Sequence, residues 1–394
     1  MAARRLLFAT SSVFYPDSSG GAEQSLLSLF DGLRRRGWEV ELVCGRSLRS
    51  PRLWASAAAQ VARLRAPSLF VRDDVRGFRC WRGPSRFRTH PRWVAWFDRH
   101  LAERRPDVVL GYNNLTCPLL RRAARAGHPS FFIVRSLANL FGASRFIPDD
   151  VHLVANSPFT ATITRQATGR PVDVVLPLVD FAAYRAEQRQ RRYVTFINPM
   201  PEKGAEVALA VARAMPEARF LFVKGKWGDR SYARVGSSGL ANVEVWEHRD
   251  DMRPVYAVTD VLLFPSQWLE TFGRVVLEAH ANAIPVVAAD VGGIPFTLGE
   301  GGLLVRPKGE AGAYVDALRR LRSDEQLYQQ LSARALANSK RPEFDPERQI
   351  DEFVAIVERQ LALRTPDVAA PALAPERVTA RPAAAVSRTA GSRT

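Results

Sequence analysis

Short apolar runs alternate along this chain with longer segments whose apolar residues recur every three or four positions. Near the N-terminus, RLLFATS is followed by AEQSLLSLFDGLRRRG, which places Leu26, Leu29 and Leu33 on one helical face, and then by EVELVC. Apolar runs of this length predict buried strands, and the periodic segment predicts an amphipathic helix. A strand, a helix and a strand with short links predict parallel pairing through a right-handed crossover.

The same alternation continues through the chain in two successive blocks. Further strands are predicted in the first block at PDVVLGYNN, HPSFFIVRS and VHLVANS, and in the second at YVTFINP, RFLFVKG, VEVWEH, VLLFPS and IPVVAAD. A polar, charged stretch at 179–192 separates the blocks. The pattern therefore predicts the α/β class with two Rossmann-like domains, at 1–180 and 193–346.

The residue pattern of the chain changes twice near its C-terminal end. Residues 347–363 form an amphipathic pattern that predicts a helix. Residues 364–394 are rich in Pro, Ala and Arg and have almost no large apolar side chain, so we expect a disordered tail.

Composition places the chain among ordinary two-domain proteins. It has 394 residues, of which 46% are hydrophobic and 24% charged, and no apolar run approaches the about 18 residues that a membrane span needs. Its N-terminus lacks the long apolar core of a signal peptide, so we expect a cytoplasmic protein. The spacing of Cys44, Cys80 and Cys117 suits neither a disulfide framework nor zinc, which predicts buried thiols.

Positive charge is the most unusual bulk property. The net charge is +16, and residues 46–105 hold 15 arginines and four acidic residues. Three interpretations of this stretch remain open: a solvated face, a contact for an acidic acceptor or a membrane surface, and a nucleic-acid site. Within it Trp93, Trp96, Phe97 and Leu101 lie at helical spacing, which favours core packing.

Several familiar chemistries lack their motifs here. The sequence has no GxxxxGK[ST], GxGxxG, GxSxG or HExxH motif, and no Asp-x-Asp pair to hold a divalent ion. An NAD-dependent oxidoreductase and a metal-dependent enzyme are therefore disfavoured, and no metal or organic cofactor is expected.

The segment FPSQWLETFGRVVLEAHANAIPVV carries two carboxylates in an apolar context. Glu270 precedes Phe272-Gly273, where a helix running to about Ala281 is predicted to begin, and Glu278 lies within that helix. The unpaired amides and positive dipole at a helix start attract anions. A carboxylate can accept two hydrogen bonds from a vicinal diol. This order of groups matches a nucleotide-sugar, whose diphosphate lies between a sugar and a ribose.

These residues resemble the retaining GT-B glycosyltransferases, in particular glycosyltransferase family four. The resemblance is carried by PSQWLETFGRVVLEAHANAIPVVAADVGG, which is similar to the family's E-x7-E segment and following Gly-Gly turn, and by INPMPEKG, VANS and SSGGAEQSLLSLFDGLRRRGWEVELV. It implies two Rossmann-like domains facing each other across a cleft, with helix 347–363 packed back on the first. The second domain would bind a nucleotide-sugar and the first an acceptor.

The resemblance also implies roles for individual residues. Glu278 would hold the ribose hydroxyls, Glu270 would face the transferred sugar, and Lys203 would neutralise the diphosphate. Gly20 and Gly21 would let the first loop approach the ligands. The remaining positions implied in donor binding are Phe272, Gly273, Arg274, Val275, Asn198, Gly292 and Gly293.

Three positions depart from the family pattern. Asn198 stands where the family usually has an arginine, and Lys224 or Lys226 is a candidate substitute for the lost charge. Arg135 stands where the family usually has a histidine that contacts the donor sugar, so we place Arg135 among the candidate catalytic residues. Phe296 replaces a frequent acidic residue.

The sequence therefore predicts a metal-independent enzyme that transfers a sugar from a nucleoside diphosphate sugar to a hydroxyl acceptor with retention. The expected partners are that donor and a small-molecule, lipid or glycan acceptor, with peripheral membrane contact through the basic stretch as an open option. The alternative is a basic protein that binds nucleic acid or an anionic membrane on a catalytically silent scaffold. Steep salt dependence of binding would distinguish this alternative.

Overall fold

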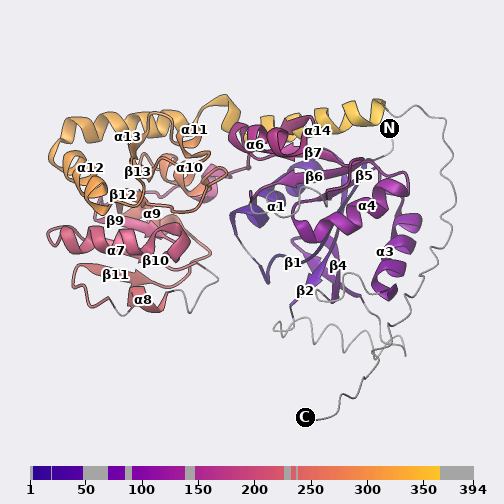
Figure 1. Ribbon diagram of the computed structural model, residues 1–394, viewed down its shortest axis with the longest axis horizontal. Coiled ribbons are helices and arrows are strands. Elements are labelled where there is room, and N and C mark those ends of the chain that lie inside the picture. Colours follow the sequence, from indigo (N-terminus) through magenta and orange to yellow (C-terminus); the bar gives the residue numbers. More distant parts are fainter. Residues whose placement is uncertain are drawn as a thin grey trace, which may run out of the picture.

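Each half of the chain forms one predominantly parallel sheet, and the two halves lie side by side in the computed structural model (Figure 1). The structure describes residues 3–18, 20–47, 70–84, 91–137, 147–225, 232–236 and 238–363. The predicted disordered tail, Lys226 and much of the basic stretch lie outside the described residues.

The first sheet has the order β3-β4-β2-β1-β5-β6-β7-β8, and all neighbours pair in parallel except β3 and β4. Its strands are β1 (Arg5–Val13), β2 (Glu39–Arg46), β3 (Val71–Val75), β4 (Phe78–Pro84), β5 (Val108–Gly111), β6 (Ser130–Val134), β7 (His152–Ala155) and β8 (Val172–Val174). Its helices are α1 (Gly21–Arg35), α3 (Pro91–Arg104), α4 (Cys117–Arg125) and α6 (Pro158–Thr168).

The second sheet has the order β11-β10-β9-β12-β13-β14 and is parallel throughout. Its strands are β9 (Tyr193–Ile197), β10 (Phe220–Val223), β11 (Val243–Trp246), β12 (Thr259–Phe264), β13 (Val286–Ala289) and β14 (Gly302–Val305). Its helices are α7 (Ala205–Ala214), α8 (Ala233–Gly236), α9 (Arg253–Val258), α10 (Arg274–His280), α11 (Ile294–Leu298), α12 (Ala311–Ser323) and α13 (Glu325–Ser339). Short 3-10 turns lie at Asn114–Thr116, Phe181–Ala183, Pro201–Lys203 and Pro342–Phe344.

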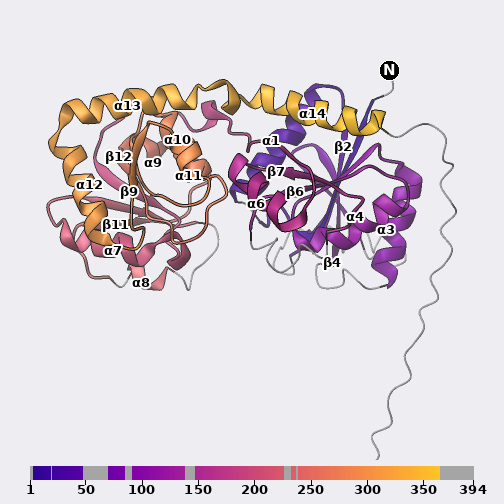
Figure 2. The same cartoon turned by 45° about the horizontal axis from the view of Figure 1, so that its top comes forward.

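The last described helix, α14 (Pro346–Ala362), returns from the second domain to the first (Figure 2). Its buried side chains, among them Ile350 and Phe353, join the core between α1 and the first sheet. A Cβ atom at Gly32 of α1 would lie 2.1 Å from Cδ1 of Ile350, so a larger residue there would force the Ile350 side chain to move. Helix α14 therefore fastens the end of the second domain onto the first.

The described part of the basic stretch is more regular than the sequence pattern indicates. The sequence predicts no strand at β3 or β4, because a hairpin whose charges alternate with buried residues gives no long apolar run. The helical spacing of Trp93, Trp96, Phe97 and Leu101 falls within α3. Core packing is confirmed for Trp93, Phe97 and Leu101, which are buried. The ring of Trp96 stacks on Phe70 with 3.7 Å between ring centroids.

Two bulk expectations can be compared with the structure. All three cysteines are buried free thiols, as predicted. Among the described residues, no helix combines the length and the apolar character needed to cross a membrane.

Candidate functional site

A cavity of about 270 Å³ lies where strands of both sheets end. Parallel α/β sheets place their ligand sites at the carboxyl ends of the strands, because the loops there converge. In the first domain Arg135 follows β6 and Asn156 follows β7, and in the second Asn198 follows β9. The lining residues are Gly21, Ala22, Arg135, Asn156, Pro177, Ile197, Asn198, Lys203, Phe264, Glu270, Thr271, Phe272, Gly273, Arg274 and Val275.

Lys203 and Glu270 form an ion pair in the wall of this cavity. Nζ of Lys203 donates to Oε1 of Glu270 at 2.6 Å, and Oγ of Ser266 donates to the same oxygen at 2.7 Å. The carboxylate is buried, with 7% of Glu270 exposed. Charge-assisted bonds of this kind fix the orientation of a side chain. The structure thus joins two residues that the sequence separates by 67 positions.

Backbone contacts hold the two loops of this ion pair together. The carbonyl oxygen of Glu202 accepts from the amides of Gln267 at 3.0 Å and Trp268 at 2.9 Å. Gly204 has φ of +91°, and a Cβ atom there would lie 2.0 Å from the carbonyl oxygen of Pro265. Only a residue without Cβ permits this conformation and this approach. Gly204 is therefore the position that sets the spacing of Lys203 from the loop that carries Glu270.

Gly292 and Gly293 support the Glu270 loop from behind and do not line the cavity. The amide of Gly293 donates to the carbonyl oxygen of Glu270 at 2.8 Å. A Cβ atom would lie 2.0 Å from that oxygen at Gly292, and 2.3 Å from the carbonyl oxygen of Thr271 at Gly293. In this arrangement the Gly-Gly turn acts by close backbone packing.

The predicted helix after Glu270 is shorter than expected. It begins at Arg274, because Gly273 has φ of +84° and ends the preceding loop in a left-handed conformation. The helix α10 runs to His280, whereas the sequence predicted a helix from Phe272-Gly273 to about Ala281.

Glu278 occupies a different environment from Glu270. Only 6% of Glu278 is exposed, its Oε2 accepts a hydrogen bond from the Tyr256 hydroxyl at 2.7 Å, and its Oε1 lies 3.5 Å from Nε of Arg274. Burial raises the pKa of the Glu278 carboxyl, and the charge of Arg274 and the bond from Tyr256 act against this shift. Glu278 does not line the cavity but lies directly behind Arg274, which does.

Arg274 connects the two domains, a role that sequence reasoning missed. Its Nη1 donates to the carbonyl oxygen of Gly21 at 3.0 Å, and its Nη2 donates to the Tyr184 hydroxyl at 3.0 Å. Sequence reasoning assigned this position only a part in donor binding. No local signal marks a contact across 253 positions, so the sequence offered no means to find it.

Thr271 makes a second link between the domains. Its hydroxyl donates to the backbone carbonyl of Arg135 and accepts from Nδ2 of Asn156, both at 3.0 Å. Asn156 belongs to the VANS motif, so the motif places its amide directly on the residue beside Glu270. Two of the segments that carry the resemblance, VANS and the Glu270 segment, therefore meet at Thr271.

Arg135 brings a positive charge into the cavity from the first domain. Its Nη1 lies 3.4 Å from the carbonyl oxygen of Ala22, and its buried Nε has no hydrogen-bond partner. Burial and the neighbouring charge of Arg274 lower its pKa to about 10, against the opposing effect of Glu23. Glu23 itself accepts hydrogen bonds from the Tyr112 hydroxyl and the amide of Gly20.

The other two residues that depart from the family pattern, Asn198 and Phe296, contact other side chains, and so does Lys224. Asn198 lines the cavity with φ of +59°, and its Oδ1 accepts from the Tyr232 hydroxyl at 2.6 Å. Nζ of Lys224 donates to Glu247 at 2.6 Å, and Lys224 does not line the cavity. Phe296 packs against Phe344, with 5.7 Å between ring centroids.

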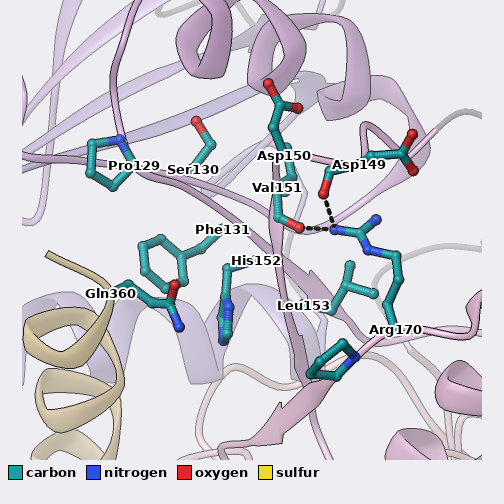
Figure 3. Close-up of a pocket in the computed structure, with 11 residues that line it drawn as sticks. Pro129, Ser130, Phe131, Asp149, Asp150, Val151, His152, Leu153, Arg170 and Gln360 are labelled. Carbon is teal, nitrogen blue, oxygen red and sulfur yellow. Dashed lines mark hydrogen bonds between the residues drawn. The ribbon is translucent and has the colours of Figure 1, made fainter. Parts of the chain in front are cut away.

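A second cavity, of about 330 Å³, lies at the amino ends of β6 and β7 (Figure 3). Its arginine, Arg170, donates to the backbone carbonyls of Pro148, Asp149 and Val151. The carboxylates of Asp149 and Asp150 point away from one another in the close-up. The cavity thus lacks a convergent set of polar groups, and we assign it no chemistry. Within the described ranges no three His, Cys, Asp or Glu side chains are grouped to hold a metal.

Comparison with known proteins connects this geometry to a class of enzymes. Residues 20–155 match the family described as "Glycosyl transferase 4-like domain", and residues 191–324 match "Glycosyl transferases group 1". Among solved structures, sucrose-phosphate synthase from Thermosynechococcus elongatus aligns with a TM-score of 0.76 at 18% identity, covering 92% of this chain and 100% of that one. A structure of Anabaena Alr3699/HepE in complex with UDP and glucose aligns with a TM-score of 0.68 at 21% identity, covering 91% of this chain and 100% of that one.

The fold is that of the GT-B class, and residues 20–155 and 191–324 each match a glycosyltransferase family. Within that class the chain resembles glycosyltransferase family four, in agreement with the motifs around Glu270 and Lys203. A relative named D-inositol 3-phosphate glycosyltransferase, from Mycolicibacterium vanbaalenii, is 32% identical over 188 residues. That match covers 39% of this chain and 42% of the relative, so the alignment spans less than half the length of this relative.

Proposed function

We propose that this protein transfers a glycosyl group from a nucleoside diphosphate sugar to a hydroxyl acceptor, with retention at the anomeric carbon and without a metal or cofactor. The observation that carries the proposal is the ion pair between Lys203 and the buried Glu270 in a cavity between two Rossmann-like domains. Such a cavity offers a positive group for phosphate and a fixed carboxylate for sugar hydroxyls, side by side.

The donor would lie with its nucleotide on the second domain. Its diphosphate would contact Lys203 and the backbone amides of residues 272–275, and its sugar would hydrogen-bond to Glu270. Glu278 accepts one bond from Tyr256 and retains acceptor capacity for ribose hydroxyls. The Anabaena protein is described in complex with UDP, with UDP and glucose, and with UDP-glucose, which supports testing UDP donors first.

The reaction requires no protein nucleophile. The bond from the anomeric carbon to the diphosphate oxygen breaks, and its electron pair stays on that oxygen. A bond forms from the acceptor oxygen to the same face of the anomeric carbon, and the acceptor's proton passes to the leaving phosphate. The protein contributes position and charge, which is where electrostatic catalysis acts.

The acceptor would bind on the first domain, beside Gly21 and Asn156. The hydroxyl acceptor remains open among a small natural product, a lipid and a glycan. The Mycolicibacterium relative is named for an inositol phosphate, which makes a phosphorylated polyol a reasonable first member of an acceptor panel.

The test is a thermal-shift panel of UDP, GDP, ADP and dTDP on the parent protein and on Glu278→Ala. A nucleotide at about one hundred times its Kd stabilises the folded state by roughly 2.7 kcal/mol. We expect one nucleotide to stabilise the parent and to lose most of this effect in the variant. If single-stranded DNA or anionic vesicles stabilise both proteins equally and no nucleotide does, the transferase proposal fails.

A second experiment tests retention. The matching sugar donor is incubated with acceptors, and NMR of the product reports the anomeric configuration; an inverted product contradicts retention.

A further inference from the structure

The cavity has less positive charge available from the second domain than a diphosphate needs. The charge of Lys203 already faces the carboxylate of Glu270 at 2.6 Å. Asn198 is neutral, and its side-chain oxygen is occupied by Tyr232. Lys224 is paired with Glu247 outside the cavity lining.

Arg274 also makes contacts that leave less of its positive charge for a ligand. It donates to Gly21 and Tyr184, and Oε1 of Glu278 lies 3.5 Å from its Nε. Each of the two described cations that the second domain brings to this cavity, Lys203 and Arg274, thus has a carboxylate beside it. A buried anion that lacks a compensating charge is costly, so a diphosphate here needs a further cation.

Among the described residues, Arg135 has no carboxylate at ion-pair distance, although the charge of Glu23 acts on it. Within the part of the chain that the structure describes, its side chain has one hydrogen bond, the 3.4 Å contact with the carbonyl oxygen of Ala22, and no ion pair. Its Nε is buried and makes no hydrogen bond; Nε of Arg274 also makes none, but it lies 3.5 Å from Oε1 of Glu278. Two guanidinium groups that line one small cavity repel each other, and an anion between them removes this cost.

We infer that Arg135 is the second cation of the diphosphate site and binds the leaving phosphate together with Lys203. The inference rests on the proposed function. When the bond from the anomeric carbon breaks, the electron pair that stays on the phosphate oxygen increases the negative charge between these two side chains. A guanidinium presents several N–H donors in a fixed plane and suits phosphate oxygens.

In this arrangement, side chains from both domains stabilise the negative charge on the leaving phosphate. Lys203 belongs to the second domain, whereas Arg135 follows β6 of the first, and its backbone carbonyl accepts from Thr271 at 3.0 Å. The domain that would bind the acceptor therefore also completes the site that stabilises the departing diphosphate. Full stabilisation requires the two domains to be in contact, as they are at Thr271 and Arg274.

The test compares Arg135→Gln and Arg135→Lys with the parent protein. Affinities for UDP, GDP, ADP and dTDP and for the matching monophosphates are measured by calorimetry. For the diphosphate that binds the parent, we expect Arg135→Gln to lose about 10- to 100-fold in affinity, as the removal of a charged hydrogen-bond partner does. Its monophosphate should change by less than about threefold, and Arg135→Lys should restore part of the diphosphate affinity because it keeps the charge.

The control is Arg319→Gln, the same change at an exposed arginine of the second domain. It should leave both affinities unaltered. If the parent binds a diphosphate and Arg135→Gln binds it equally well, the inference is overturned, whereas the proposed function stands. Equal losses for diphosphate and monophosphate also overturn it, because they indicate general damage to the site. If the parent binds none of the four diphosphates, the proposed function itself fails.

Discussion

Nη1 of Arg274 in the second domain donates to the carbonyl oxygen of Gly21 in the first, at 3.0 Å. The same guanidinium donates to Tyr184, which lies in the connection between the domains. Since Gly21 begins α1 and Arg274 begins α10, this one side chain ties together the starts of two helices that border the cavity. The contact is therefore both a wall of the candidate site and a link between the domains.

Replacement of Arg274 by lysine should weaken the proposed glycosyl transfer more than it weakens stability. A lysine keeps a positive charge beside Glu278 but cannot bond to Gly21 and Tyr184 at once with a planar group. We expect kcat to fall about tenfold or more, in line with the loss of a positioning contact. The free energy of unfolding, measured with urea, should change by less than about 1 kcal/mol. Arg319→Lys is the matched control, and an Arg274→Lys enzyme with parental kcat would contradict the proposed link.

Gly204→Ala should be strongly destabilising. Its Cβ atom would lie 2.0 Å from the carbonyl oxygen of Pro265, and its φ of +91° disfavours any side chain. Backbone strain and displacement of the Lys203 loop should together cost about 2 kcal/mol or more of the unfolding free energy.

The matched control for Gly204 is Gly169→Ala. Gly169 also has positive φ, of +67°, but a Cβ atom there meets nothing within 4 Å. This variant should lose only about 1 kcal/mol. Urea unfolding of both variants measures the difference, and equal losses would show that contact with Pro265 does not matter.

The Lys203–Glu270 pair should behave as a coupled unit. Lys203→Met leaves a buried carboxylate whose remaining side-chain donor is Ser266. We expect a loss of about 1 to 3 kcal/mol of unfolding free energy. The double variant with Glu270→Gln should recover part of it, with a coupling energy of about 0.5 to 3 kcal/mol. A double-mutant cycle by urea unfolding measures this energy, and strict additivity would show that the two side chains do not interact in solution.

Glu278→Gln should change how stability depends on pH. Burial raises the pKa of this carboxyl in the folded state above its ordinary value of 4.5. The unfolded chain therefore releases this proton at lower pH, so the parent loses stability as pH rises from about 4.5 through the folded pKa. The variant has no such titration, and its stability relative to the parent should increase between pH 4.5 and pH 7.

Urea midpoints at the two pH values measure the effect of Glu278. Glu352→Gln, a change at an exposed carboxylate of α14, serves as the control and should follow the parent. If the parent and Glu278→Gln keep a constant difference across this range, Glu278 is not held in the buried environment described above.

Much of the fold could be predicted because its signals are local. Apolar runs such as those of β1, β9 and β12 are buried on both sides of a parallel sheet, so they appear in the sequence as continuous hydrophobic segments. The hairpin of β3 and β4 was missed because its exposed, charged positions interrupt any such run.

The candidate site was predicted only in part, for a related reason. The spacing of Glu270 and Glu278 and the PEKG turn around Lys203 are readable along the chain, because each is a short segment with a recognisable pattern. Their partners are not readable. The hydroxyl that donates a hydrogen bond to Glu278 belongs to Tyr256, 22 positions away. The guanidinium that donates to the carbonyl oxygen of Gly21 belongs to Arg274, 253 positions away.

The sequence by itself determined the two α/β domains, most of their strands and the segments that carry the candidate site. The tertiary structure alone decided which carboxylate faces the cavity, which of the described cations lining it forms no ion pair and which glycines bear the closest backbone contacts. The physical reason is that periodicity and turn chemistry act over a few neighbouring residues. Ion pairs, burial and steric contact depend on atoms that packing brings together from distant parts of the chain.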